Sequence, residues 1–146
     1  MCPLTMSYNR SRSEVTIARR YLDHGFLDVA LRMFSRNVEH VRSDDWTRLV
    51  TRLVEAGRVP EAIETCRLGG VPMPRRELLA LGDRRLRCKD VDAAIHYYEL
   101  AEASHERWSA VVDVLTRLPA RELQAIAVTE RHLVASLQPM RVAASA

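Results

Sequence analysis

The stretch "GRVPEAIE" (residues 57–64) decides the fold, because close copies of it stand at the same interval on either side. "GFLDVALR" (25–32) lies thirty-two residues before it, and "KDVDAAIH" (89–96) lies thirty-two residues after it. Each copy has the pattern of a turn that runs into a helix. Recurrence of one phrase at a fixed interval predicts an architecture of repeated helical units.

The same shift along the chain aligns apolar and small residues over a much longer stretch than these phrases. The matching sets are Ala30, Ala62 and Ala94; Leu27, Val59 and Val91; Leu31, Ile63 and Ile95; Ile17, Leu49 and Leu81; and the turn residues Gly25, Gly57 and Lys89. We expect the alanines where the two helices of one hairpin cross, since a larger side chain would push the helices apart. We expect the glycines to end the first helices in the left-handed conformation.

Apolar positions recur at three- and four-residue spacings along nearly the whole chain, and no long alternating run predicts a strand. The fold class is therefore all-α: an α-solenoid of three to four antiparallel helix hairpins with a C-terminal capping helix. The first helices are expected at 13–23, 45–55 and 76–87, the second helices at 27–39, 59–69 and 90–102, and a degenerate fourth pair at 105–118 and 120–137. Ser11 to Glu14 has capping-box spacing and predicts the start of the first helix.

This pattern predicts a single repeat domain between two short terminal segments. The expected boundaries are an N-terminal arm at 1–10, a domain at 11–137 with units at about 11–42, 43–74, 75–104 and 105–137, and a tail at 138–146. Polar residues of the last helix suit a terminal cap with a wettable outer face.

Composition favours a globular protein, with 47% hydrophobic and 28% charged residues among 146. The formal net charge is +3, and Lys89 is the sole lysine, so the positive charge is almost all arginine. Arginine favours carboxylates and phosphates, although a GC-rich gene also produces such a composition. The chain has no apolar stretch suited to a secretory signal or a membrane span, so we expect a cytoplasmic location.

No pattern of a catalytic or metal site is present. Cys2, Cys66 and Cys88 show no CxxC spacing, the histidines show no ligand pairing, and no phosphate-binding glycine loop or nucleophile motif occurs. The prediction is a protein without enzymatic activity, metal or cofactor. Trp46 and Trp108 lie on the apolar stripes of first helices, which favours core positions over exposed binding anchors.

The third unit has Leu78, Leu81, Gly82, Ala94, Tyr98 and Ala101 in one register. This set, with its weaker counterparts in the first two units, resembles the tetratricopeptide repeat, while "WTRLVTRLVEAGRVPEAIE" (46–64) is also similar to pentatricopeptide proteins. The tetratricopeptide resemblance implies a concave groove that holds a peptide or helix of another protein. The groove positions that it implies are Arg12, Val15, Arg19, Leu22 and Asp23; Asp44, Thr47, Thr51, Val54 and Glu55; and Arg76, Leu79, Asp83, Leu86 and Arg87.

The arginines and the acidic residues of this implied groove are equal in number. The groove is therefore formally neutral and does not form the long basic stripe that favours nucleic acid. Its apolar members would form a floor for partner side chains, or alternatively would pack adjacent units against each other. The expected function is a non-catalytic adaptor, assembly factor or small chaperone that binds a protein segment. The alternative is an RNA-binding protein of pentatricopeptide type that uses surface arginines. Self-association through the ends, or a place in a larger complex, is compatible with either.

Overall fold

The computed structural model describes residues 3–134, with side chains from residue 8 onward, and within this range the chain is all-helical, without a strand. The all-α prediction is confirmed. The elements are α1 (Pro3–Asp23), α2 (Leu27–Arg36), the short 3-10 helix η1 (Val38–His40), α3 (Ser43–Glu55), α4 (Val59–Gly69), α5 (Arg75–Arg87), α6 (Val91–Leu100), α7 (His105–Arg117), α8 (Glu122–Val128) and the π-helical turn η2 (Thr129–Val134). None of the helices in the described range is long and apolar enough to cross a membrane.

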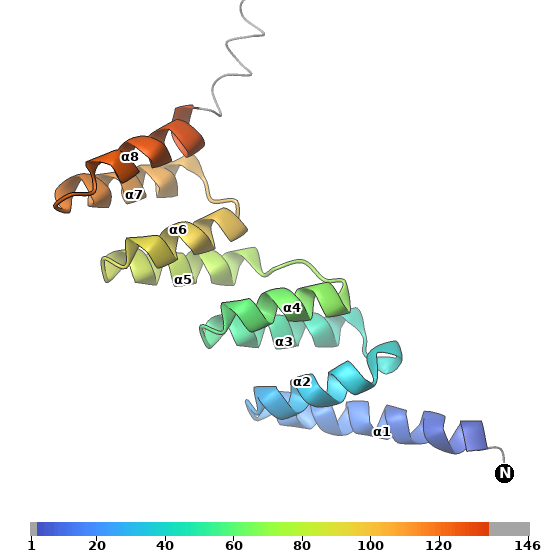
Figure 1. The fold of residues 1–146 in the computed structure, drawn as a ribbon. Helices are drawn as coiled ribbons and strands as arrows, with labels where there is room; N and C mark the ends of the chain where they lie inside the picture. The colour runs from blue at the N-terminus through green and yellow to red at the C-terminus, as the bar shows by residue number, and fades with distance from the viewer. Residues whose placement is uncertain (1–2, 135–146) are drawn as a thin grey trace, which may run out of the picture. The chain divides into compact units, whose positions relative to one another are not determined.

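The chain divides into two compact units, Met1–Glu77 (unit 1) and Leu78–Ala146 (unit 2), where the sequence pattern predicts one domain. Unit 1 contains the hairpins α1/α2 and α3/α4 and the first turn of α5, and unit 2 contains α5 from Leu78 onward, α6 and the hairpin α7/α8 (Figure 1). Consecutive hairpins within a unit also touch, because α2 packs against α3 and α6 packs against α7. The units differ in charge: residues 1–77 carry 13 arginines and 10 acidic residues, whereas residues 78–146 carry nine of each sign.

The turns within the first three hairpins have the same conformation and hydrogen bond. Gly25 and Gly57 have positive φ angles, and Lys89 adopts the same left-handed conformation at φ 60°. In the first turn Phe26 N–H donates to the carbonyl of Tyr21 over 2.9 Å. The equivalent bonds run from Arg58 to Leu53 and from Asp90 to Arg85. These bonds satisfy carbonyls that the end of a helix otherwise leaves without a hydrogen-bond donor. Because the three turns share this geometry, α1, α3 and α5 end at equal intervals along the chain.

The core of each of the first three hairpins forms around a small residue of the second helix. Ala30, Ala62 and Ala94 are fully buried, as expected for a close crossing of two helices. Gly82 of α5 plays the same part from the first helix, because a Cβ atom there would lie 2.5 Å from a ring carbon of Tyr98. Unit 1 and unit 2 each add an edge-to-face aromatic contact between hairpins, Phe34–Trp46 and Tyr98–Trp108.

The first helix begins well before the start that the sequence pattern predicts. α1 begins at Pro3, so Ser11 to Glu14 lies inside the helix and is not its N-terminal cap. The stretch between these points contains no glycine or further proline to stop a helix, and Pro3 suits a first helical position. Glu14 instead accepts a hydrogen bond from Asn37 Nδ2 over 2.8 Å and thereby holds the end of α2.

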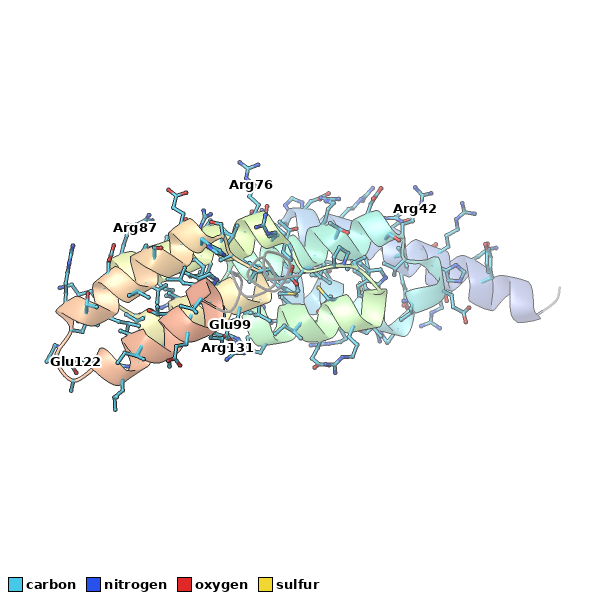
Figure 2. The ribbon with its side chains drawn as sticks, turned by 90° about the horizontal axis from the view of Figure 1, so that it is seen from above. Arg42, Arg76, Arg87, Glu99, Glu122 and Arg131 are labelled. Atoms are coloured by element: carbon cyan, nitrogen blue, oxygen red, sulfur yellow. The ribbon has the colours of Figure 1, made fainter. Side chains whose placement is uncertain are left out.

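The last described helix is interrupted by a π-helical turn, where the sequence pattern predicts a continuous helix over 120–137. In η2 the ring of His132 stacks on that of Trp108, with 3.6 Å between the ring centres. Arg131 and His132 both approach Glu99 of α6, at 3.4 and 3.5 Å, and Figure 2 shows Arg131 beside Glu99. The expected tail at 138–146 and Cys2 lie outside the described residues.

Candidate functional site

In unit 1 a partly buried ion pair joins the first helices α1 and α3. Arg19 of α1 donates from Nε and Nη2 to the two carboxylate oxygens of Asp45 on α3, each over 2.9 Å. Asp45 also accepts the backbone N–H of Arg42 over 3.1 Å and so caps the start of α3. Burial raises the pKa of Asp45, but these hydrogen bonds outweigh it and hold the pKa below its ordinary value.

Unit 2 has an ion pair at the corresponding place, with a tyrosine added. Asp83 of α5 accepts two hydrogen bonds from Arg107 of α7, over 3.0 and 3.1 Å, and a third from Tyr98 Oη over 2.5 Å. Burial raises the pKa of Asp83. The hydrogen bonds from Arg107 and Tyr98 lower it by more than burial raises it, so the pKa lies below its ordinary value and the group stays ionised. Burial and the adjacent carboxylate raise the pKa of Tyr98, which keeps its hydroxyl as a donor.

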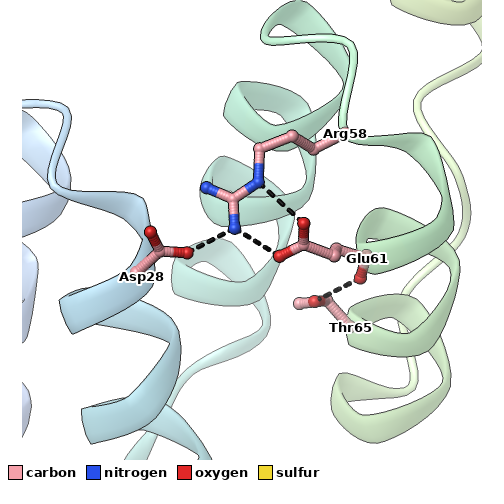
Figure 3. Close-up of polar contacts among 4 residues, drawn as sticks. All are labelled: Asp28, Arg58, Glu61 and Thr65. Atoms are coloured by element: carbon pink, nitrogen blue, oxygen red, sulfur yellow. Dashed lines mark hydrogen bonds and ion pairs between the residues drawn. The ribbon is translucent and has the colours of Figure 1, made fainter.

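On the opposite side of each unit, a cluster of polar residues ties the starts of the second helices together. Arg58, at the N-cap of α4, bridges Asp28 of α2 and Glu61 of its own helix (Figure 3). In unit 2, Arg121 at the N-cap of α8 bridges Asp92 of α6 and Gln124 in the same way. Both sides of adjacent hairpins are thus held at a set distance.

The gap between α1 and α3 forms an open cleft of about 360 Å³, which we call cleft 1. Its lining residues are Leu22, Asp23, Thr47, Arg48, Thr51, Arg52 and Glu55. The Leu22 side chain is buried and closes the bottom, whereas the exposed wall is polar and charged. An ion pair between Asp23 and Arg48, both about half exposed, crosses the rim.

The gap between α5 and α7 forms a second open cleft of about 480 Å³, which we call cleft 2. Its lining residues are Asp83, Leu86, Arg87, Tyr98, Glu106, Arg107, Ala110 and Val114. Leu86, Ala110 and Val114 give this cleft an apolar wall that cleft 1 lacks. Arg87 and Glu106 are exposed charges of opposite sign beside that wall.

The residues that the family resemblance implies for a groove divide into two groups. Those that line a cleft are Leu22, Asp23, Thr47, Thr51 and Glu55 in unit 1 and Asp83, Leu86 and Arg87 in unit 2. Those outside both linings are Arg12, Val15, Arg19, Asp44, Val54, Arg76 and Leu79. Val15, Val54 and Leu79 are buried, so they support the helices from beneath and offer no surface to a partner.

Several lining residues escape the sequence pattern, and those of α7 form the largest set. α3 begins at Ser43 and α7 at His105, so Ala110 and Val114 of α7 correspond to Arg48 and Arg52 of cleft 1. Extension of the predicted groove register into the fourth pair would have found Glu106, the counterpart of Asp44, but neither Ala110 nor Val114, because Arg48 and Arg52 also lie outside the predicted groove. The pattern does not reveal that Tyr98 reaches the cleft from a second helix, since its ring is mostly core.

The described residues contain no cluster of three or more potential metal ligands. Cys66 is buried, which raises the pKa of its thiol, and its sulfur lies 3.2 Å from that of Met73. Comparison of the chain with protein-family models, curated proteins and solved structures gives no match.

Proposed function

We propose that this protein is a non-catalytic interaction module of the cytoplasm, an adaptor, assembly factor or small chaperone, that holds a peptide or helix of another protein in clefts 1 and 2. The observation that carries the proposal is the pair of open clefts between first helices, each lined by exposed charges of both signs. Ion pairs at fixed positions preorganise the walls, which reduces the entropy lost on binding.

The architecture behind this proposal is a tetratricopeptide-like solenoid of four hairpins, with α8 and η2 as its terminal cap. Support comes from the recurrence of turns, buried alanines and helix ends at one fixed interval through the first three hairpins.

Cleft linings indicate the chemistry of the partner segment. Cleft 2 suits an apolar side chain between Leu86 and Val114, with charged neighbours placed against Arg87 and Glu106. Cleft 1 offers hydroxyls and both signs of charge, which suit polar and charged side chains of a bound segment. The apolar anchor would supply affinity, and the charges would set its register.

The test compares partner capture by cleft-blocking variants with capture by matched controls. Ala110→Arg fills cleft 2, and Ser109→Arg adds the same group at an exposed neighbour outside the lining. Thr47→Arg fills cleft 1, and its control is Thr16→Arg. Each threonine is exposed and donates its hydroxyl to the carbonyl four residues earlier.

We expect a stoichiometric protein partner that survives nuclease and moderate salt, binds both controls, and loses at least tenfold in affinity with either blocking variant. Equal binding by blocking and control variants would exclude the clefts. Recovery of nucleic acid that disappears between about 50 and 200 mM salt would instead favour RNA binding by surface arginines.

A further inference from the structure

One face of α1 exposes apolar side chains at positions that are buried in α3 and α7. Ile17 and Tyr21 are 46% and 37% exposed. Leu49 and Leu53, the residues one repeat interval later on α3, are fully buried. The corresponding residues of α7 are Val111 and Leu115, which are also fully buried.

Packing within the units explains this difference. α3 lies between α2 and α4, and α7 lies between α6 and α8, so helices cover both sides of each. Among the described residues of unit 1, α1 packs against α2 and η1, and no second helix of a preceding hairpin covers its other side. The free face of α1, which consists of Arg10, Ser13, Ile17, Arg20 and Tyr21, is therefore shaped to receive a second helix of a hairpin.

The last helix of the described range exposes a complementary face. Leu123 and Ile126 are 84% and 55% exposed, although the counterparts of Ile126 in α4 and α6, Ile63 and Ile95, are half-buried. The free face of α8 and η2 consists of Glu122, Leu123, Ile126 and Glu130, which recur at helical spacing.

Charge distinguishes the two faces and makes them complementary. Exposed Arg10 and Arg20 bracket Ile17 on α1, although Arg10 also lies 3.8 Å from Glu14. Exposed Glu122 and Glu130 bracket Ile126 on α8 and η2, and Figure 2 shows Glu122 at the start of α8. A helix pair formed from these faces would bury apolar residues between two cation–anion pairs.

We propose that the free face of α8 and η2 of one copy of this protein docks on the free face of α1 of a second copy. The helices run antiparallel, as α2 and α3 do where Phe34 near the end of one meets Trp46 near the start of the other. This orientation puts Arg20 near Glu122 and Arg10 near Glu130. It concerns α1, α8 and η2 and is independent of the clefts and of any partner that they bind.

The contact is heterologous, so every copy that uses one face leaves the other face free. Association therefore proceeds head to tail into open chains, or into a ring where the two ends of such a chain meet. Wild-type protein should show a weight-average mass that rises with concentration through multiples of 16.7 kDa. Salt should weaken the association because its flanking ion pairs are exposed.

Sedimentation of three single variants tests the faces. Ile17→Asp and Ile126→Asp each place a carboxylate in one free face, and each should stay at 16.7 kDa where the wild type associates. Leu68→Asp is the control, because Leu68 is 44% exposed on α4 and belongs to neither face. It should associate like the wild type. Far-UV circular dichroism checks that every variant keeps its helices.

A mixture of the two face variants distinguishes this arrangement from its alternatives. Ile17→Asp retains a sound α8 face and Ile126→Asp retains a sound α1 face, so the mixture should form a 1:1 dimer and nothing larger. A wild type that stays monomeric at millimolar concentration would overturn the proposal. Association that survives either single variant, which indicates contact between like faces, would overturn it too.

The flanking charges provide a further check on orientation. Arg20→Glu should weaken association roughly tenfold, and addition of Glu122→Arg should restore most of it. Restoration by Glu130→Arg in place of Glu122→Arg would show that the helices run parallel and would overturn the antiparallel arrangement.

Discussion

Unit 1 and unit 2 place an ion pair at the same positions with the charges exchanged. In unit 1 the arginine is Arg19 on the first hairpin and the acid is Asp45, the third residue of α3. In unit 2 the acid is Asp83 on the earlier hairpin and the arginine is Arg107, the third residue of α7. Packing of the helices therefore sets the position of the ion pair. Either helix can carry the arginine, provided that the other helix carries the acid.

The exchange has a consequence for the pairing of hairpins. Arg19 opposite Arg107, or Asp83 opposite Asp45, would bring like charges together in a partly buried place. Such a mismatch costs free energy, so the two polarities disfavour assembly of a hairpin with the wrong neighbour. The aromatic contacts between hairpins do not discriminate in this way, because Phe34–Trp46 and Tyr98–Trp108 have ring centres 5.6 and 5.8 Å apart.

Removal of an indole should have the largest effect and tests whether the units are separate in stability. Trp46→Ala and Trp108→Ala should each lower the free energy of unfolding by about 3–5 kcal/mol, because both indoles are buried between hairpins. Hydrogen exchange measured by mass spectrometry should rise mainly in the unit that carries the change. Equal acceleration in both units after either substitution would show that the units unfold together.

Reversal of a single charge should have the next largest effect. Arg19→Asp places a second carboxylate opposite Asp45, whose side chain is only 8% exposed. This variant should lower the free energy of unfolding in denaturant by about 3 kcal/mol. The double variant with Asp45→Arg should regain part of this loss. Recovery should be incomplete, because Asp45 also accepts the Arg42 N–H that an arginine cannot.

The same exchange in unit 2 sharpens the comparison. The double variant Asp83→Arg with Arg107→Asp creates a carboxylate at the third residue of α7, where the carboxylate can accept a backbone N–H. The same exchange removes the carboxylate that accepts the hydrogen bond of Tyr98 Oη. We expect the double variant to be more stable to denaturant than Asp83→Arg alone. Equal stability of the two would show that the charges of this ion pair cannot be exchanged between the two helices.

The elements that the sequence predicts well are those with local causes. Gly25 and Gly57 mark turns because few other residues adopt their φ angles at low cost, and the repeat interval places Lys89 at the third turn despite its side chain. The alanines at 30, 62 and 94 likewise indicate close helix crossings, because a larger side chain would not fit at these fully buried positions.

The elements that the sequence pattern misses depend on side chains that meet across hairpins. Arg19 belongs to the groove that the family resemblance implies, yet its guanidinium is bound to Asp45, a contact that spacing along one helix does not predict. Val15 and Val54 have the pattern of a groove floor, but neighbouring helices bury them. Exposure within an amphipathic stripe depends on what packs beside it, which a single helix does not encode.

Gly82→Ala should have a moderate effect whose sign is informative. Helix propensity alone predicts that alanine stabilises a helix interior by about 1 kcal/mol. The added Cβ would lie 2.5 Å from Cε1 of Tyr98, whose ring is buried and whose hydroxyl is bound to Asp83, so the ring cannot move away freely. We expect a net loss of about 1–2 kcal/mol in denaturant unfolding. Stabilisation would show that the crossing of α5 and α6 is looser than described.

The smallest effect should come from the protonation of His132, a group without a counterpart in unit 1. Burial against Trp108 lowers the pKa of His132 below its ordinary value near 6.5, and the nearby Arg131 acts in the same direction while Glu99 opposes it. A lowered pKa means that the unfolded chain binds the proton more readily, so stability is present above pH 6.5 and declines as pH falls below it. In a Trp46→Phe background, the emission of Trp108 should therefore change between pH 7 and 5, and the melting temperature should fall slightly. His132→Gln should remove both changes, whereas their persistence would assign them to another group.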